Sequence, residues 1–144
     1  MSDQPREYPP EFYARLLFYA EADLWNAEQS LQQTSGFWHI PCFAARESAE
    51  KTLKAFLEAA GKSAPTLHGL SKLLQDCMAV DKEFGRFQLH VKRLARYQTD
   101  ARYPDEAKEY DFTAEEATEA VRLARELFDT VRDKIERRKR DGLL

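Results

Sequence analysis

Apolar residues recur at three- and four-residue steps along almost the whole chain, and this period constrains the fold more than any other feature of the sequence. The stretches that carry it are residues 10–34, 38–60, 68–80, 81–102 and a last run that begins at residue 113. This spacing places the apolar side chains on one face of an α-helix. The sequence therefore predicts an all-α protein, an up-and-down antiparallel four-helix bundle with one additional short helix at residues 68–80.

Local signals predict where these helices begin and end. Gly36 and Gly61 follow the first two apolar stripes and are natural helix stops. Asp81 and Thr113 are suited to cap the N-termini of the fourth and last helices. Pro104 disfavours helical backbone at the residue before it, so the fourth helix is expected to end near Arg102.

The size and charge of the chain limit its function and compartment. The 144 residues suit a single domain, 1–144, with a core over about 10–136 and a basic C-terminal tail at 137–144. The net charge of -3 gives no global positive field, so any nucleic-acid binding must use a local patch. No signal-peptide pattern or membrane-spanning apolar run occurs. We expect a cytoplasmic protein whose Cys42 and Cys77 are free, buried thiols.

A pair of lysines lies beside the apolar face of the second helix. Lys51 and Lys54 are three residues apart, and each follows a glutamate by four residues, Glu47 and Glu50. Pairs at this spacing form surface ion pairs on a solvated helix face, which is the default interpretation. The alternative is that Lys51 and Lys54 face a groove and bind a phosphate.

The segment at residues 97–105 reads Tyr-Gln-Thr-Asp-Ala-Arg-Tyr-Pro-Asp and interrupts the helical pattern. It places Arg102 between the phenol side chains of Tyr97 and Tyr103 in sequence. A guanidinium beside phenols can hold a phosphate and stack on a base. The default interpretation is a corner that only caps the bundle.

Catalytic signals are sparse. His68 and His90 are the candidate acid–base groups, because histidine titrates near neutral pH. The default interpretation is that His68 caps the third helix and that His90 occupies a surface or interface position. The sequence has no metal-ligand spacing, serine nucleophile motif or glycine-rich phosphate loop, so we expect no metal and no cofactor.

Several segments, taken in order, resemble the HEPN family of small all-α domains. The most specific are the run from Glu50 to Ala55, which reads Glu-Lys-x-x-Lys-Ala, and Arg102-Tyr103-Pro104. Residues 20–27, 44–57 and 68–70, Gly61 and an alanine-rich last helix add to the similarity. The resemblance implies a five-helix bundle that is often dimeric, with Asp23 as a buried or interfacial polar anchor, paired with an arginine.

The resemblance also implies a choice of activities. Many family members accompany a minimal nucleotidyltransferase, and some are toxins of toxin–antitoxin pairs. A subset are metal-independent ribonucleases that carry an arginine, four to six residues and then a histidine. Here Arg96 is followed at that spacing by Arg102, so the proton-transfer group is missing while the phosphate-binding charge remains.

We therefore expect a non-catalytic, homodimeric module that binds nucleotide or RNA and works with a separately encoded nucleotidyltransferase. The expected binding residues are Arg96, Tyr97, Arg102, Tyr103, Lys51 and Lys54. One alternative is a divergent metal-independent endoribonuclease or toxin that uses His68 or His90. A second alternative is a purely structural dimerisation domain.

Overall fold

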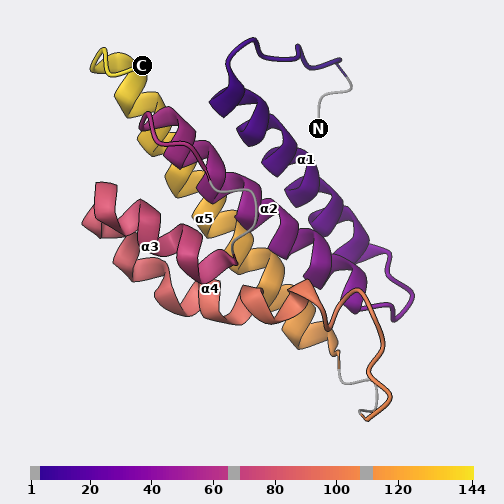
Figure 1. Cartoon of the computed structure of the whole chain (residues 1–144). Helices are drawn as coiled ribbons and strands as arrows, with labels where there is room; N and C mark the ends of the chain where they lie inside the picture. The colour runs from indigo at the N-terminus through magenta and orange to yellow at the C-terminus, as the bar shows by residue number, and fades with distance from the viewer. Residues whose placement is uncertain (1–3, 65–68, 108–111) are drawn as a thin grey trace.

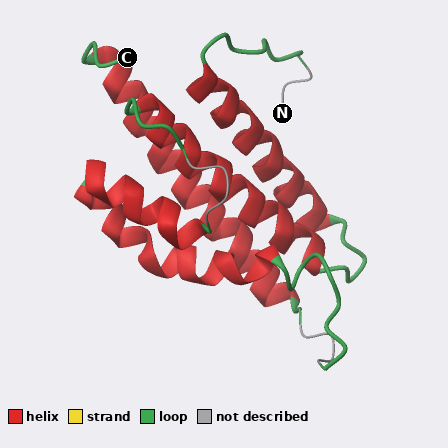
Figure 2. Cartoon of the chain, in the orientation of Figure 1, coloured by secondary structure: helices red, strands yellow, loops and turns green. Residues whose placement is uncertain are grey.

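The chain folds into helices joined by short loops (Figures 1 and 2). The computed structural model describes residues 4–64, 69–107 and 112–144, and no strand occurs within these ranges. Two short 3-10 helices, η1 and η2, flank α4. The elements are α1 (Phe12–Gln32), α2 (His39–Ala59), α3 (Leu70–Val80), η1 (Lys82–Phe87), α4 (Gln88–Ala95), η2 (Arg96–Gln98) and α5 (Ala114–Arg140). The predicted all-α class is confirmed.

Helix α2 forms the centre of the bundle. It packs against α1, α3, α4, η2 and α5. Helix α1 runs antiparallel to α2, whereas α5 runs in the same direction as α2 (Figure 1). Helices α1, α2 and α5 are the long members of the bundle, whereas α3 has 11 residues and α4 has 8, with η1 and η2 on either side of α4.

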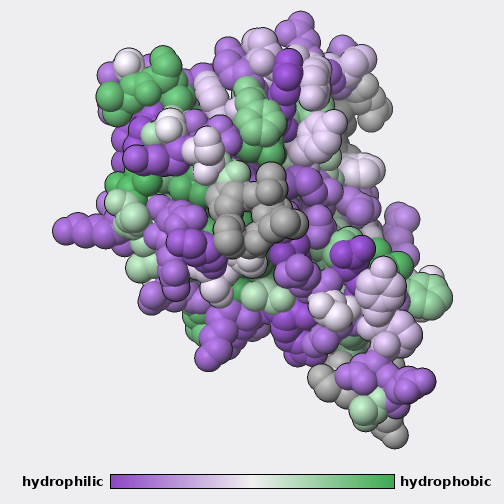
Figure 3. All heavy atoms as spheres, viewed as in Figure 1, coloured by the Kyte–Doolittle hydropathy of each residue, from purple (hydrophilic) through white to green (hydrophobic). Residues whose placement is uncertain are grey.

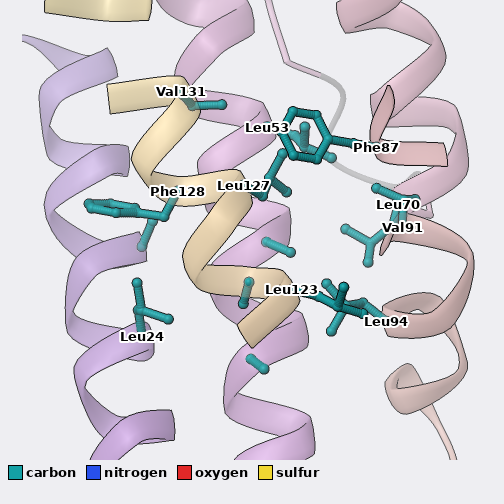
Figure 4. Packing of buried hydrophobic residues seen from close by; sticks show 14 of the residues in the cluster. Leu24, Leu53, Leu70, Phe87, Val91, Leu94, Leu123, Leu127, Phe128 and Val131 are labelled. Carbon is teal, nitrogen blue, oxygen red and sulfur yellow. The ribbon is translucent and has the colours of Figure 1, made fainter. Parts of the chain in front are cut away.

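Small side chains let α1 and α5 approach α2 closely. Ala20 of α1, Ala49 of α2 and Ala124 of α5 are fully buried. The Ser48 hydroxyl donates a hydrogen bond to the Ala20 carbonyl oxygen (2.8 Å), which ties α2 to α1. Larger side chains fill the remaining interior, where Leu123 of α5 points toward Leu94 of α4 (Figure 4).

The predicted helix ends are mostly confirmed. Gly36 has a φ of 89° and Gly61 a φ of 76°. Glycine adopts such positive-φ backbone without steric cost. The Thr113 hydroxyl accepts a hydrogen bond from the Glu116 backbone N–H (3.0 Å) and caps α5. The Asp81 carboxylate caps η1 by accepting from the Glu83 N–H (3.0 Å).

The fourth helix differs from its prediction. A continuous helix over 81–102 was expected, but the α-helical part ends at Ala95, and residues 99–102 form a turn. A 3-10 helix places residues three apart on one side, so η1 buries both Phe84 and Phe87. At the other end, the Thr99 carbonyl accepts the backbone N–H groups of Arg102 and Tyr103, both at 3.0 Å. The corner is therefore a hydrogen-bonded turn rather than a helix end.

The basic run near the C-terminus belongs to a helix. Arg137, Arg138, Lys139 and Arg140 form the last turn of α5, so the predicted tail at 137–144 is helical as far as Arg140. Positive charge at a helix C-terminus is favourable because the helix dipole is negative there. The Arg138 guanidinium also lies over the ring of Phe56, 5.5 Å from its centroid.

The segment before α1 folds back along that helix. Arg6 forms an ion pair with Glu21 (3.0 Å), and the Tyr8 ring meets the Phe18 ring edge-on at a centroid distance of 5.9 Å. Arg15 holds the segment by donating from Nε to the Pro9 carbonyl (2.9 Å). These contacts lie outside the bundle core, on the outer side of α1 (Figure 1).

The core gives a first prediction. The Phe56 and Phe84 ring centroids lie 4.5 Å apart, so Phe56→Ala leaves a cavity beside Phe84. Such a truncation is expected to lower the free energy of unfolding by about 3–5 kcal/mol. Leu89→Ala is the control, since the Leu89 side chain is 55% exposed. Its loss should cost about 0.5 kcal/mol or less. Urea denaturation of both variants measures the difference, and equal losses would contradict the packing described.

Candidate functional site

Arg102 follows η2 in the turn and lies near two aromatic rings. Its guanidinium carbon is 5.6 Å from the ring centroid of Phe43 and 5.5 Å from that of Tyr103. Across residues 4–64, 69–107 and 112–144, no carboxylate forms an ion pair with Arg102. Asp105 instead accepts from the Ala107 N–H (2.9 Å). A stacked guanidinium keeps its edge N–H groups available for an anion.

Arg96 and Tyr97 are held differently from Arg102. The Arg96 guanidinium pairs with Glu116 of α5 (2.5 Å), and the Tyr97 hydroxyl donates to the same carboxylate (2.9 Å). Tyr97 is only 4% exposed, so its ring belongs to the core. Asp100 also lies 4.0 Å from Arg96, so the charge of Arg96 at the surface is accompanied by carboxylates.

The interior beneath Arg96 stays uncharged at neutral pH. Burial, together with the charge of Glu116, raises the pKa of the Cys42 thiol to about 12. Burial also raises the pKa of Tyr97, with further contributions from Cys42 and Glu116. Cys42 and Cys77 are free and buried, as predicted.

A row of aromatic rings continues from Tyr97 across this end of the bundle. Ring centroids are 6.0 Å apart between Tyr97 and Phe112, 6.2 Å between Phe112 and His39, and 6.3 Å between His39 and Phe37. Arg96 lies over Phe112 at 5.7 Å. The rings come from the α1–α2 connection, the start of α2, η2 and the segment before α5, which meet at one end of the bundle (Figure 1).

The row of aromatic rings and the contact between Arg102 and Phe43 both use the first turns of α2. His39 belongs to the aromatic row and Phe43 holds Arg102, and residues four apart are neighbours on one helix face. We call the combined set the arginine–aromatic surface. It consists of Phe37, His39, Phe43, Arg96, Arg102, Tyr103 and Phe112.

A small cavity lies next to Arg96. It has a volume of about 320 Å³ and is lined by Arg93, Arg96, Tyr97, Glu115, Glu116 and Glu119. Arg93 pairs with Glu119 (2.6 Å), as Arg96 does with Glu116. Both guanidiniums in the lining are thus already paired, and the cavity adds no strongly positive site.

Lys51 and Lys54 lie in a network of ion pairs on α2. Lys51 pairs with Asp23 of α1 (2.5 Å) and with Glu47 (3.5 Å), and Lys54 pairs with Glu50 (3.2 Å). Burial alone would lower the pKa of Lys51, but the hydrogen bond to Asp23 and the nearby carboxylates raise it. Both predicted i,i+4 pairs are present, and a phosphate would have to displace a carboxylate from either lysine. The arginine partner expected for Asp23 is wrong, because its partner is Lys51.

The same network contains Arg46, which the sequence did not single out. Its side chain is 4% exposed, and its terminal nitrogens contact Glu47 (3.0 Å), Glu50 (2.8 Å) and the side-chain oxygen of Gln98 (3.2 Å). In the sequence, Arg46 lies next to glutamates as a surface arginine on a helix would. The helical spacing therefore gave no sign that its side chain is buried. Phe43 could have been recognised from the sequence as a candidate for the site. It is an aromatic residue that does not belong to the predicted apolar face of its helix.

Of the two candidate histidines, only His90 is among the described residues, and it is not part of the arginine–aromatic surface. His68 lies outside the described residues. His90 is mostly buried, and its Nε2 hydrogen-bonds Glu126 of α5 (2.7 Å) while its ring packs edge-on against Phe87 (5.0 Å). That hydrogen bond, despite some burial, lowers the pKa of Glu126. The His90 Nδ1 is buried and has no hydrogen-bond partner within the described ranges.

Residues 4–64, 69–107 and 112–144 lack two further features. They contain no group of three or more His, Cys, Asp and Glu side chains placed to bind a metal ion. None of their helices combines the length and apolarity needed to cross a bilayer. Figure 3 shows one face on which hydrophilic side chains predominate and hydrophobic ones form small, separate patches.

Comparison with known proteins decides the family. The family model described as the HEPN domain matches residues 13–134, which is most of the chain. The protein belongs to the HEPN family. No curated protein gave a match.

Solved structures agree with this HEPN fold. TT1696 from Thermus thermophilus is 30% identical, with a TM-score of 0.71 and coverage of 85% of this chain and 97% of its own. ST0689, an archaeal HEPN homologue, is 24% identical, with a TM-score of 0.68 and coverage of 85% and 97%. The HEPN domain protein tm0613 from Thermotoga maritima is 21% identical, with a TM-score of 0.67 and coverage of 85% and 98%. The last two similarities establish the fold alone.

The buried thiol beneath the surface of this HEPN domain gives a pH prediction. The pKa of Cys42 is raised in the folded state, so its contribution to stability is complete below its ordinary value of 9.0 and is lost as the pH rises toward about 12. Over that interval, Cys42→Ala should make the unfolding free energy fall less steeply than in the wild type, by up to about 1.4 kcal/mol per pH unit. Denaturant titrations at several alkaline pH values measure the slopes, and parallel slopes would contradict the burial of the thiol.

Proposed function

We propose that this HEPN domain is a non-catalytic accessory module that binds a nucleotide or RNA through the arginine–aromatic surface. The observation that carries the proposal is the cation–π contact of Arg102 with both Phe43 and Tyr103, with no carboxylate pairing it in the described ranges. Tyr103 is 64% exposed, so its ring can also meet a base. Arg102 then supplies charge to the phosphate, and the rings supply stacking.

The distribution of charge supports a small, local phosphate-binding site rather than an extended basic surface along a nucleic acid. The chain has a net charge of -3, and most of its cations, including Lys51, Lys54 and Arg96, lie beside carboxylates. An anion gains most from a guanidinium that has no competing carboxylate. Arg102 is therefore the residue whose removal should weaken binding most.

The arrangement of His90 favours binding over catalysis. A general acid or base must reach the atom whose proton it moves. In His90, Nε2 is engaged by Glu126 and Nδ1 is buried, so neither nitrogen faces a substrate. The position at which ribonucleases of this family need a histidine is occupied by Arg102, whose guanidinium stays protonated.

Arg102→Ala tests this function directly. A nucleoside triphosphate should raise the melting temperature of the wild type, and a fluorescently labelled single-stranded RNA should bind it in an anisotropy titration. Arg102→Ala should abolish the thermal shift and weaken RNA binding about tenfold, because one phosphate contact and one stacking partner are lost. The slope of log K against log salt should shrink by roughly 0.7, the value for one contact to a single strand.

Arg132→Ala is the matched control for this test. It removes the same charge from an exposed arginine that pairs with Asp129 on α5, and it should leave ligand binding unchanged. Absence of binding to every nucleotide and RNA by the wild type would refute the proposal. A lowered melting temperature in Arg102→Ala with unchanged binding would favour a purely structural corner. Metal-free RNA cleavage that His90→Ala abolishes would favour the ribonuclease alternative.

We also propose that the module is a homodimer that works with a separately encoded minimal nucleotidyltransferase, as the family resemblance implies. The second half of α1, beyond the part that the preceding segment contacts, supports a contact with a second copy, since Trp25 is 48% exposed there. An uncharged line runs along the same helix at steps of three and four residues. Two such lines can pack without opposing like charges; each consists of Ala22, Trp25 and Gln29.

Trp25→Glu tests the role of α1 in dimerisation. The wild type should sediment as a dimer, and Trp25→Glu should shift it toward monomer, because a carboxylate would be buried at the interface. Leu89→Glu on α4 is the control, as Leu89 is similarly exposed but far along the chain from α1. A dimer that survives Trp25→Glu but not Leu89→Glu would place the interface on α4 instead.

A further inference from the structure

Arg46 is a buried cation that reaches from α2 to the chain just before the Arg102 turn. Its side chain is 4% exposed, although arginine is rarely buried in proteins. Two of its contacts, to Glu47 and Glu50, remain within α2. The third joins α2 to η2, because its terminal nitrogen donates to the side-chain oxygen of Gln98 (3.2 Å).

Stability gives only a weak reason for this arginine. Ionic groups in a protein interior can often be replaced by apolar side chains without loss, since desolvation offsets their attraction. The Arg46 Nε is buried and finds no acceptor in the described parts of the chain, which adds a further cost. The two carboxylates do not depend on Arg46 either, because Lys51 pairs with Glu47 and Lys54 pairs with Glu50.

The contact to Gln98 lies where it can fix the turn. Gln98 ends η2, and the next carbonyl, that of Thr99, accepts the N–H groups of Arg102 and Tyr103. The other end of the turn also returns to α2, where Arg102 lies over Phe43. Helix α2 thus holds the turn at both ends, through a hydrogen bond at the start and a stacked ring at the end.

We propose that Arg46 is a positioning residue for the arginine–aromatic surface. It acts through Gln98, holds the turn at residues 99–102 in register with α2, and sets where Arg102 lies over Phe43, without touching the ligand. The functional consequence rests on the proposed binding of nucleotide or RNA. The structural part does not, because it concerns the ligand-free protein.

Amide hydrogen exchange in the ligand-free protein tests the positioning. Arg46→Met retains the length and packing of the side chain but removes the bond to Gln98. It should speed exchange at the Arg102 and Tyr103 amides about tenfold, as expected for loss of a hydrogen bond to a charged group. Core amides of α2 and α5 should be unchanged. Gln98→Leu should reproduce this pattern, and the double variant should add nothing more.

The controls separate positioning from general destabilisation. Arg125→Met removes another guanidinium that joins two helices, through its pair with Glu28 (2.6 Å), and it should leave exchange at the turn unchanged. Gln98→Glu should slow exchange at the turn, because the hydrogen bond becomes an ion pair. If Arg46→Met does not fold, the Gln98 variants decide the result alone, since Gln98 is exposed. Unchanged exchange in Gln98→Leu, or faster exchange throughout the chain, would overturn the proposal.

Binding of labelled single-stranded RNA provides the functional readout. If the wild type binds, Arg46→Met and Gln98→Leu should each weaken binding by a factor smaller than Arg102→Ala does, and Gln98→Glu should retain the wild-type affinity. If the wild type does not bind, the proposed function fails, while the exchange data still decide whether Arg46 holds the turn. Normal binding by Gln98→Leu despite a loosened turn would refute the functional consequence.

Discussion

The close approach of α2 to α1 and α5 is the constraint on which the rest of this structure depends. Alanines line the contact, so the helices can approach closely. In the same contact the small Ser48 side chain donates a hydrogen bond to a backbone carbonyl of α1. Because α2 is enclosed on most sides, the polar residues on its remaining face must pair with each other or with neighbouring elements. Lys51 and Arg46 do so, the first with Asp23 of α1. The ion-pair network is therefore a consequence of the packing of α2.

Much of the fold could be predicted from the sequence, because helix period and capping residues act locally. The apolar stripes predicted the number and order of the helices, and Gly61, Asp81 and Thr113 marked three of the ends. The region around α4 could not be predicted in the same way. Two buried phenylalanines spaced by three suit a 3-10 helix as well as an α-helix, and tertiary packing decides between them.

The candidate site was less predictable, because ion pairing depends on residues distant in the sequence. Arg96 and Arg102 are both arginines near one corner, and only the fold shows that Glu116 pairs with the first. Lys51 likewise had the spacing of a phosphate-binding residue, and only the fold places Asp23 of α1 beside it. The burial of Arg46 could not be predicted from the sequence for the same reason. Only the fold brings η2 against α2, where Gln98 accepts a hydrogen bond from Arg46.

The length of α5 separates the two basic regions of the chain. Its first turn carries Glu116, which holds Arg96 at the arginine–aromatic surface, and its last turn carries the run from Arg137 to Arg140. The helix has 27 residues. At a rise of about 1.5 Å per residue, the helix is about 40 Å long. A mononucleotide is far too short to touch both ends. A ligand bound at the arginine–aromatic surface would therefore reach the last turn of α5 only if it were an extended polymer.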